Sequence, residues 1–179
     1  MWYWDKTMKK LLVLFLLLGL VTCLSYSEQL SVRVIINSVD VISPDGETKN
    51  YTKPEDVPNI DYSYKVIANG MLILNYHSVG IMLKNKQGLL IAKHPITNLL
   101  IFSKVEGTRP GPIVVTFDSS TIAQMTADTI FTLKYDEEDN SVTMGVVDGH
   151  ATLKISGEEA ELVANETFKY KLKGDRNAV

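Results

Sequence analysis

Residues Ala127–Glu166 of the chain read ADTIFTLKYDEEDNSVTMGVVDGHATLKISGEEAELVANE. Apolar and polar residues alternate over Thr129–Tyr135 and again over Ala151–Ile155, as in strands that bury one face and leave the other in water. A wholly acidic turn, Asp136–Asn140, follows the first run, and Asp148-Gly149 precedes the second. Asp-Gly supplies the positive φ that tight hairpins require. The stretch therefore predicts two successive hairpins, one across each turn.

The same period of two extends over the rest of the chain from Leu30 onward. Turn residues separate the runs at Pro44-Asp45-Gly46, Asn69-Gly70 and Ser156-Gly157. Several runs are apolar on both faces, which is typical of central strands: Met71–Leu74, Gly80–Leu83, Leu89–Ala92 and Leu99–Phe102. The sequence predicts an all-β fold, an antiparallel β-sandwich or β-roll built of successive hairpins and preceded by an N-terminal signal segment.

The amino-terminal residues have the pattern of an export signal. Lys9 and Lys10 precede an apolar run, Leu11–Val21, and Ser25 and Ser27 are the small residues that precede a cleavage site. We expect residues 1–27 to be a signal peptide, with Met8 as an alternative start, and residues 28–179 to form a single domain. The apolar run is shorter than the ~20 residues of a bilayer span, although an uncleaved signal anchor is an alternative.

Cys23 is the only cysteine in the chain, and it lies within this leader. Cleavage after Ser27 leaves the mature protein without a cysteine, so we expect its stability to come from its core and not from disulfides. Leu20-Val21-Thr22-Cys23 also approximates a lipobox, which makes lipidation of Cys23 a minority hypothesis. The expected location is periplasmic or extracellular, with membrane attachment only through an uncleaved or lipidated leader.

The charge of the chain narrows the classes of partner. The formal net charge is -3 at pH 7. Removal of residues 1–27 takes away three lysines and one aspartate, which leaves 15 Lys and Arg against 20 Asp and Glu, a net charge of about -5. The mature domain lacks the excess of basic residues that would attract nucleic acid or anionic lipid. We therefore expect no nucleic-acid partner.

Residues that carry chemistry are sparse in this sequence. His77, His94 and His150 lie in different segments, without the spacing of metal ligands, and there is no Gly-x-Ser-x-Gly motif. Asp136–Asn140 lacks the ligand alternation, glycine and terminal glutamate of a calcium loop, so we interpret it as a solvated hairpin tip. The sequence predicts a protein that is not an enzyme, with no metal and no cofactor.

Aromatic residues are the remaining functional signal. Tyr62, Tyr64 and Tyr76 lie in strand-like runs of the first half, and a shared face would make them a platform for a carbohydrate or peptide. The alternative, which we favour, is that such tyrosines cover the β core. Tyr62, Tyr64 and Tyr76 are nevertheless the candidate binding surface.

The carboxyl half resembles a FecR-type domain. The matching segments are Ser120–Ala123, Asp128–Leu133, Val142–Leu153 and Leu162–Glu166. With a looser match in the first half, the resemblance covers about residues 30–172, although Asp128 and Asn165 replace glycines of the family pattern. The resemblance implies an extracytoplasmic module, here without the cytosolic regulatory region that the best-known members carry.

Three hypotheses of function follow. The first, which we favour, is an exported non-enzymatic FecR-like β-domain that acts as an envelope binding, sensory or scaffold module for an envelope or extracellular protein or polymer. Strand addition at an exposed sheet edge is the expected mode of binding. The second is a β-jellyroll lipid carrier of the cell envelope, which would need an apolar groove. The third is an enzyme, which would need paired carboxylates in a cleft.

Overall fold

The computed structural model describes residues 30–58, 60, 63–94, 96–97 and 99–173. Residues 1–29, which include Cys23 and the expected signal peptide, and Tyr62 lie outside the described residues. Within that part the chain forms fifteen strands and one short 3-10 helix, η1 (Pro54–Asp56). The strands are β1 (Ser31–Ile36), β2 (Val39–Ile42), β3 (Thr48–Tyr51), β4 (Tyr64–Ala68), β5 (Met71–Tyr76), β6 (Val79–Leu83), β7 (Gly88–Lys93), β8 (Leu100–Lys104), β9 (Ile113–Thr116), β10 (Thr121–Met125), β11 (Ile130–Asp136), β12 (Ser141–Asp148), β13 (His150–Ile155), β14 (Glu158–Val163) and β15 (Thr167–Lys171).

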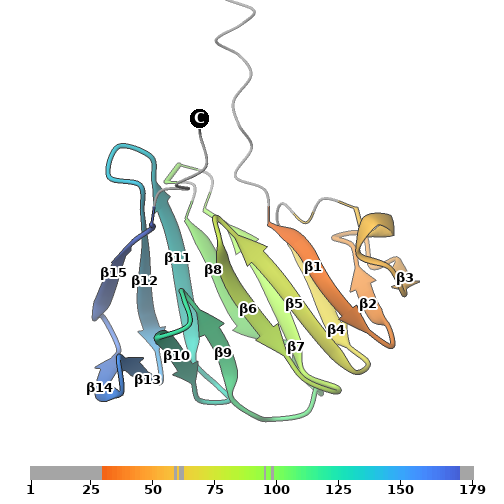
Figure 1. Cartoon of the computed structure of the whole chain (residues 1–179). Coiled ribbons are helices and arrows are strands. Elements are labelled where there is room, and N and C mark those ends of the chain that lie inside the picture. Colours follow the sequence, from red (N-terminus) through yellow and green to blue (C-terminus); the bar gives the residue numbers. More distant parts are fainter. Residues whose placement is uncertain (1–29, 59, 61–62, 95, 98, 174–179) are drawn as a thin grey trace, which may run out of the picture.

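The strands form two sheets that pack face to face (Figure 1). The seven-stranded sheet, nearer the viewer in Figure 1 and called the front sheet, has the order β1-β5-β6-β9-β10-β13-β14. The eight-stranded back sheet has the order β15-β12-β11-β8-β7-β4-β2-β3. Every strand pair is antiparallel. The predicted all-β antiparallel sandwich of successive hairpins is confirmed. No helix in the described part of the chain is long and apolar enough to span a bilayer.

The chain alternates between the two sheets. From β5 to β14 it completes one hairpin in the front sheet, crosses to the back sheet for the next hairpin, and then returns. The predicted hairpin across Asp136–Asn140 is present, because β11 pairs with β12. The predicted hairpin across Asp148-Gly149 is wrong, because β12 belongs to the back sheet and β13 to the front sheet. Gly149, at φ +81°, makes a sharp turn between the sheets instead.

The core lies between the sheets and follows from the alternation of the strands. In β5 the buried residues are Leu72, Leu74 and Tyr76, while the residues between them are partly exposed. The opposite sheet contributes Phe102 and Phe131, whose rings stack with their centroids 4.8 Å apart. Burial of apolar side chains from both sheets is the main source of stability here, since each contributes about 1.5–3 kcal/mol.

Candidate functional site

A row of apolar side chains crosses the outer face of the front sheet. The strand register places Val34 opposite Ile73, Ile73 opposite Met82, and Met82 opposite Val114. Each of these four residues is partly exposed and alternates along its strand with residues on the core side. With neighbouring strands ~4.8 Å apart, the row spans about 14 Å. Apolar residues therefore occupy a continuous line on a surface that faces water.

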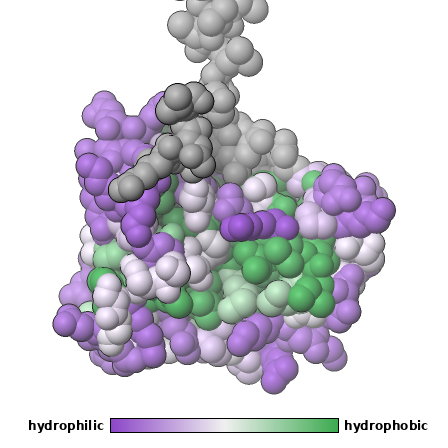
Figure 2. Space-filling view, in the orientation of Figure 1, coloured by the Kyte–Doolittle hydropathy of each residue, from purple (hydrophilic) through white to green (hydrophobic). Residues whose placement is uncertain are grey.

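Two further residues widen this line into a patch. Ile36 pairs with Met71, two residues along β1 and β5 from Val34 and Ile73 and on the same face. The Ile36 side chain is 49% exposed. We call Val34, Ile36, Met71, Ile73, Met82 and Val114 the front patch. Figure 2 shows the hydrophobic residues gathered over β1, β5 and β6, with hydrophilic residues around them. Contiguous exposed apolar surface of this kind marks interaction sites in soluble proteins.

The outer face of the back sheet has a different composition. One of its cross-strand rows is Lys134, Thr143 and Lys169, and another places Lys65 opposite Leu90 and Leu90 opposite Ser103. The first row has two lysines and no apolar residue, and in the second row a lysine and a serine flank Leu90. The back sheet therefore offers no patch of the same kind along them.

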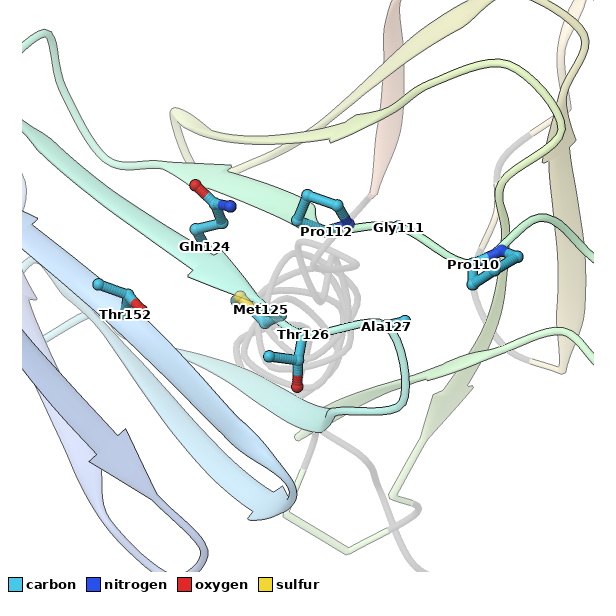
Figure 3. A pocket seen from close by; sticks show the side chains of 8 residues that line it. All are labelled: Pro110, Gly111, Pro112, Gln124, Met125, Thr126, Ala127 and Thr152. Carbon is cyan, nitrogen blue, oxygen red and sulfur yellow. The ribbon is translucent and has the colours of Figure 1, made fainter.

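An open hollow of about 460 Å³ lies at the lower end of the front sheet. Figure 3 shows Gly111 and Pro112 beside Met125 and Thr126, with Gln124 and Thr152 farther along the strands. The lining residues are Pro110, Gly111, Pro112, Gln124, Met125, Thr126, Ala127 and Thr152, none of which has an ionisable side chain. The hollow therefore provides neither a carboxylate nor an imidazole for acid-base chemistry.

Gln87 fixes the loop that forms one wall of this hollow. Its buried side chain accepts a hydrogen bond from the Lys84 N–H (2.7 Å) and donates one to the Pro112 carbonyl (3.2 Å). A Cβ atom at Gly111 would lie 2.7 Å from the Gln87 Nε2 atom, so a larger residue there would displace the Gln87 amide. The loop that precedes β9 is thus held against the end of β6.

Strand parity places the described tyrosines of the candidate surface inside the sandwich. Tyr76 is fully buried, and its hydroxyl accepts a hydrogen bond from the Tyr135 N–H at 3.1 Å. Tyr64 packs against the core from the back sheet. Tyr76 is therefore no part of an exposed platform, which corrects that expectation, and Tyr62 and Cys23 lie outside the described residues.

The three histidines are not brought together. His77 lies in the β5–β6 turn, where its ring stacks on Tyr135 with a centroid distance of 3.8 Å. Burial lowers the pKa of His77, because its Nε2 atom is inaccessible and has no hydrogen-bond partner among the described residues. His94 accepts a hydrogen bond from the Thr97 N–H (3.4 Å), and His150 begins β13. Within the described ranges no group of three or more His, Cys, Asp or Glu residues could hold a metal ion.

A polar cluster joins the front sheet to the edge of the back sheet. Asp118, in the β9–β10 turn, accepts hydrogen bonds from the Tyr170 hydroxyl (2.7 Å), the Ser120 N–H (2.8 Å) and the Lys173 ammonium (3.2 Å). These donors, the Tyr170 hydroxyl above all, hold the pKa of Asp118 well below its ordinary value. Burial and the bond to Asp118 raise the pKa of Tyr170 to about 12. The cluster satisfies its own donors and acceptors, as a structural link does.

The acidic turn is organised by its own backbone. The Asp136 carboxylate accepts hydrogen bonds from the N–H groups of Glu138 (3.1 Å) and Asp139 (3.4 Å). Asp139 also forms an ion pair with Lys169. The carboxylates of Asp136 and Asp139 therefore have partners within the chain, as expected of a hairpin tip.

The sequence contained a signal for the front patch that the prediction did not use. The runs around Ile73 and Met82 are apolar on both faces, and from the sequence we interpret this only as the mark of central strands.

Comparison of the chain with protein-family models, with curated proteins and with solved structures gives no match. The FecR resemblance therefore stays a hypothesis, and the candidate site depends on geometry alone.

Proposed function

We propose that this protein is an exported, non-enzymatic β-domain that binds a protein of the cell envelope or the extracellular medium through the front patch. The observation that carries the proposal is the apolar row Val34, Ile73, Met82 and Val114 on the outside of a sandwich whose core is already filled. A partner that covers this face removes apolar surface from water, and this lowers the free energy of the complex. The domain then acts as a binding, sensory or scaffold module.

Export is supported by the amino-terminal sequence. Lys9 and Lys10, the apolar run Leu11–Val21 and the small residues before position 28 have the order of a cleavable signal. A mature chain without cysteine does not depend on the redox state of its compartment. The FecR resemblance, which we retain as a proposal, suggests the same extracytoplasmic location.

A protein partner fits the charge of the domain better than a membrane does. The mature chain has a net charge of about -5, which an anionic lipid surface would repel. The front patch itself contains no lysine or arginine that could contact lipid phosphates. A lipid carrier would need an apolar groove between the sheets, whereas buried side chains such as Leu74, Phe102 and Phe131 occupy that space.

The experiment is affinity capture from an envelope extract with residues 28–179 as bait, followed by mass spectrometry. Two variants introduce the same charge on opposite faces: Met82→Asp in the front patch and Thr143→Asp on the back sheet. Thr143 lies between Lys134 and Lys169 in the register, so an aspartate there should be tolerated. Circular dichroism and Tm establish that both variants fold.

The proposal predicts one dominant protein that the wild type and Thr143→Asp recover and that Met82→Asp loses. Capture that survives Met82→Asp would place the binding surface elsewhere and contradict the proposal. Recovery of lipid in place of protein would support the carrier hypothesis. Turnover of a substrate that is abolished by one polar substitution would overturn the non-enzymatic assignment.

A further inference from the structure

Among the described residues, the last two strands form the free edges of the two sheets on the same side of the sandwich. β14 ends the front sheet and β15 ends the back sheet, and residues 164–166 connect them. Figure 1 shows both strands at the left of the molecule. Free strand edges expose backbone donors and acceptors that a further strand can pair with. This side of the molecule therefore presents two pairing surfaces.

The two edges carry opposite charge. β14 has the sequence EEAELV, with three glutamates and no basic residue. β15 has the sequence TFKYK, with two lysines and no acidic residue. Glu159 and Glu161 lie on the outer face of the front sheet, because their neighbour Ala160 pairs with the buried Leu153. Lys169 lies on the outer face of the back sheet in the same way, since it pairs with Thr143.

The backbone groups that point to the open edges can be identified from the register. Ser156 donates its N–H to the Ser120 carbonyl, which directs the even-numbered residues of β13 toward β10 and the odd-numbered ones toward β14. In β14 the residues bonded to β13 are therefore Glu158, Ala160 and Leu162. Glu159 and Glu161 direct their N–H and C=O groups to the open edge.

The same reasoning applies to β15. Leu172 donates its N–H to the Asn140 carbonyl at 2.9 Å, so the even-numbered residues of β15 bond to β12. Thr167, Lys169 and Lys171 direct their backbone groups to the open edge. In both strands, then, the charged outer residues are also the residues with outward-pointing backbone groups.

We propose that β14 of one copy of this chain pairs in antiparallel register with β15 of a second copy. The register places Lys169 opposite Glu161 and Lys171 opposite Glu159, and both positions are hydrogen-bonded pairs by the parity described above. On the inner face the same register places Phe168 opposite Leu162. Charge, backbone parity and apolar contact therefore agree on one alignment.

The charges select this pairing over the other two. Charged edge residues commonly prevent sheets from joining, and here a β14–β14 contact would oppose glutamates while a β15–β15 contact would oppose lysines. The mixed contact alone brings opposite charges together. Lys169 and Glu159 already have partners within the chain, Asp139 and Lys154, so pairing adds a second opposite charge to each.

The test is the association state of residues 28–179, measured by sedimentation velocity over a range of concentrations at low salt. One variant carries Glu159→Lys and Glu161→Lys, and a second carries Lys169→Glu and Lys171→Glu. Each variant alone opposes like charges at the contact, so its dissociation constant should rise at least about tenfold. An equimolar mixture of the two variants opposes unlike charges again and should restore association.

Restoration in the mixture also demonstrates that both variants fold. Lys49→Glu, on the edge strand β3 at the other end of the back sheet, is the matched control and should leave association unchanged. A wild type that is monomeric up to ~1 mM overturns the proposal, because that limit corresponds to a negligible contact. Association that persists in both double variants, or that Met82→Asp abolishes, overturns it as well. The capture experiment on the front patch is independent of either result.

Discussion

The outer faces of the two sheets are built from the same alternating pattern and yet differ in character. The front sheet presents Val34, Ile73, Met82 and Val114 in one row, whereas the back sheet presents Lys134, Thr143 and Lys169. Both rows are compatible with the strands that carry them, because the core that joins the sheets is made of the inner residues. The fold therefore constrains the outer residues less than the inner ones, and the binding that we propose would account for an apolar row among them.

The two faces also differ in how closely their side chains pack. A Cβ atom at Gly80, on the front sheet, would lie 3.7 Å from the nearest heavy atom, the Ile73 Cγ2. A Cβ atom at Gly145, on the back sheet, would lie 2.8 Å from the Thr132 Oγ1. The back face is closed at this point, while the front face has room. The two faces therefore differ in packing at these two glycines.

The largest expected effect comes from a change in the core that the two sheets share. Phe131→Ala removes one ring of the stacked pair in the core, where both rings are fully buried. We expect a loss of about 3–5 kcal/mol in the free energy of unfolding, measured by urea denaturation. A loss below about 1 kcal/mol would mean that the two sheets do not share one core, and the comparison of their outer faces would fail.

A smaller effect separates the faces directly. Gly145→Ala should cost about 1–3 kcal/mol, because the added methyl group meets the nearly buried Thr132. Gly80→Ala should instead raise the free energy of unfolding by about 0.4–1 kcal/mol, because alanine restricts the unfolded chain and has space in the folded one. Urea denaturation of the two variants measures both values. Equal losses of unfolding free energy in Gly145→Ala and Gly80→Ala would show that the two faces do not differ in packing at these positions.

The smallest effect concerns the Asp118–Tyr170 link between the sheets. The pKa of Asp118 is lowered in the folded state from its ordinary value of 3.8. Its carboxylate therefore stabilises the fold at pH values above 3.8, and this stability is lost as the pH falls below 3.8. The pKa of Tyr170 is raised to about 12 from 10.0, so its share is present below pH 10 and lost between pH 10 and 12. Unfolding measured at both extremes of pH tests each direction.

Tyr170→Phe isolates the phenol in this cluster. The variant should unfold at a slightly lower urea concentration at neutral pH and should lack the part of the alkaline loss that belongs to Tyr170. Tyr135→Phe, which removes a hydroxyl that donates to Asn140, is the matched control and should keep that loss. If Tyr170→Phe retains the full alkaline loss, the link between the sheets depends on other groups.

Much of the fold was predictable because a period of two is a strong local signal. The runs around Thr129–Tyr135 and Ala151–Ile155 both became strands, and the acidic turn became a hairpin tip. The role of Asp148-Gly149 was not predictable, since a glycine with positive φ suits a hairpin and a turn between sheets equally well. Which of the two forms depends on the distant partners β10 and β15.

The candidate site was less accessible to sequence reasoning. Exposed tyrosines are a familiar mark of binding, but the parity of β5 places Tyr76 inside. The front patch needs the register of β1, β5, β6 and β9, and of these strands only β5 and β6 follow each other in the chain. A two-faced apolar strand in a sheet that packs on one side is the sequence signal for such a patch.

The pairing of β1 with β5 also bears on the speed of folding. Ile36 lies opposite Met71 and Ser31 opposite Asn75, so β1 pairs with residues that come 35 to 44 positions later in the chain. Sheets that depend on pairings so distant in sequence fold slowly. Under the proposed export, slow closure of the sandwich would suit a polypeptide that must stay unfolded while it crosses a membrane.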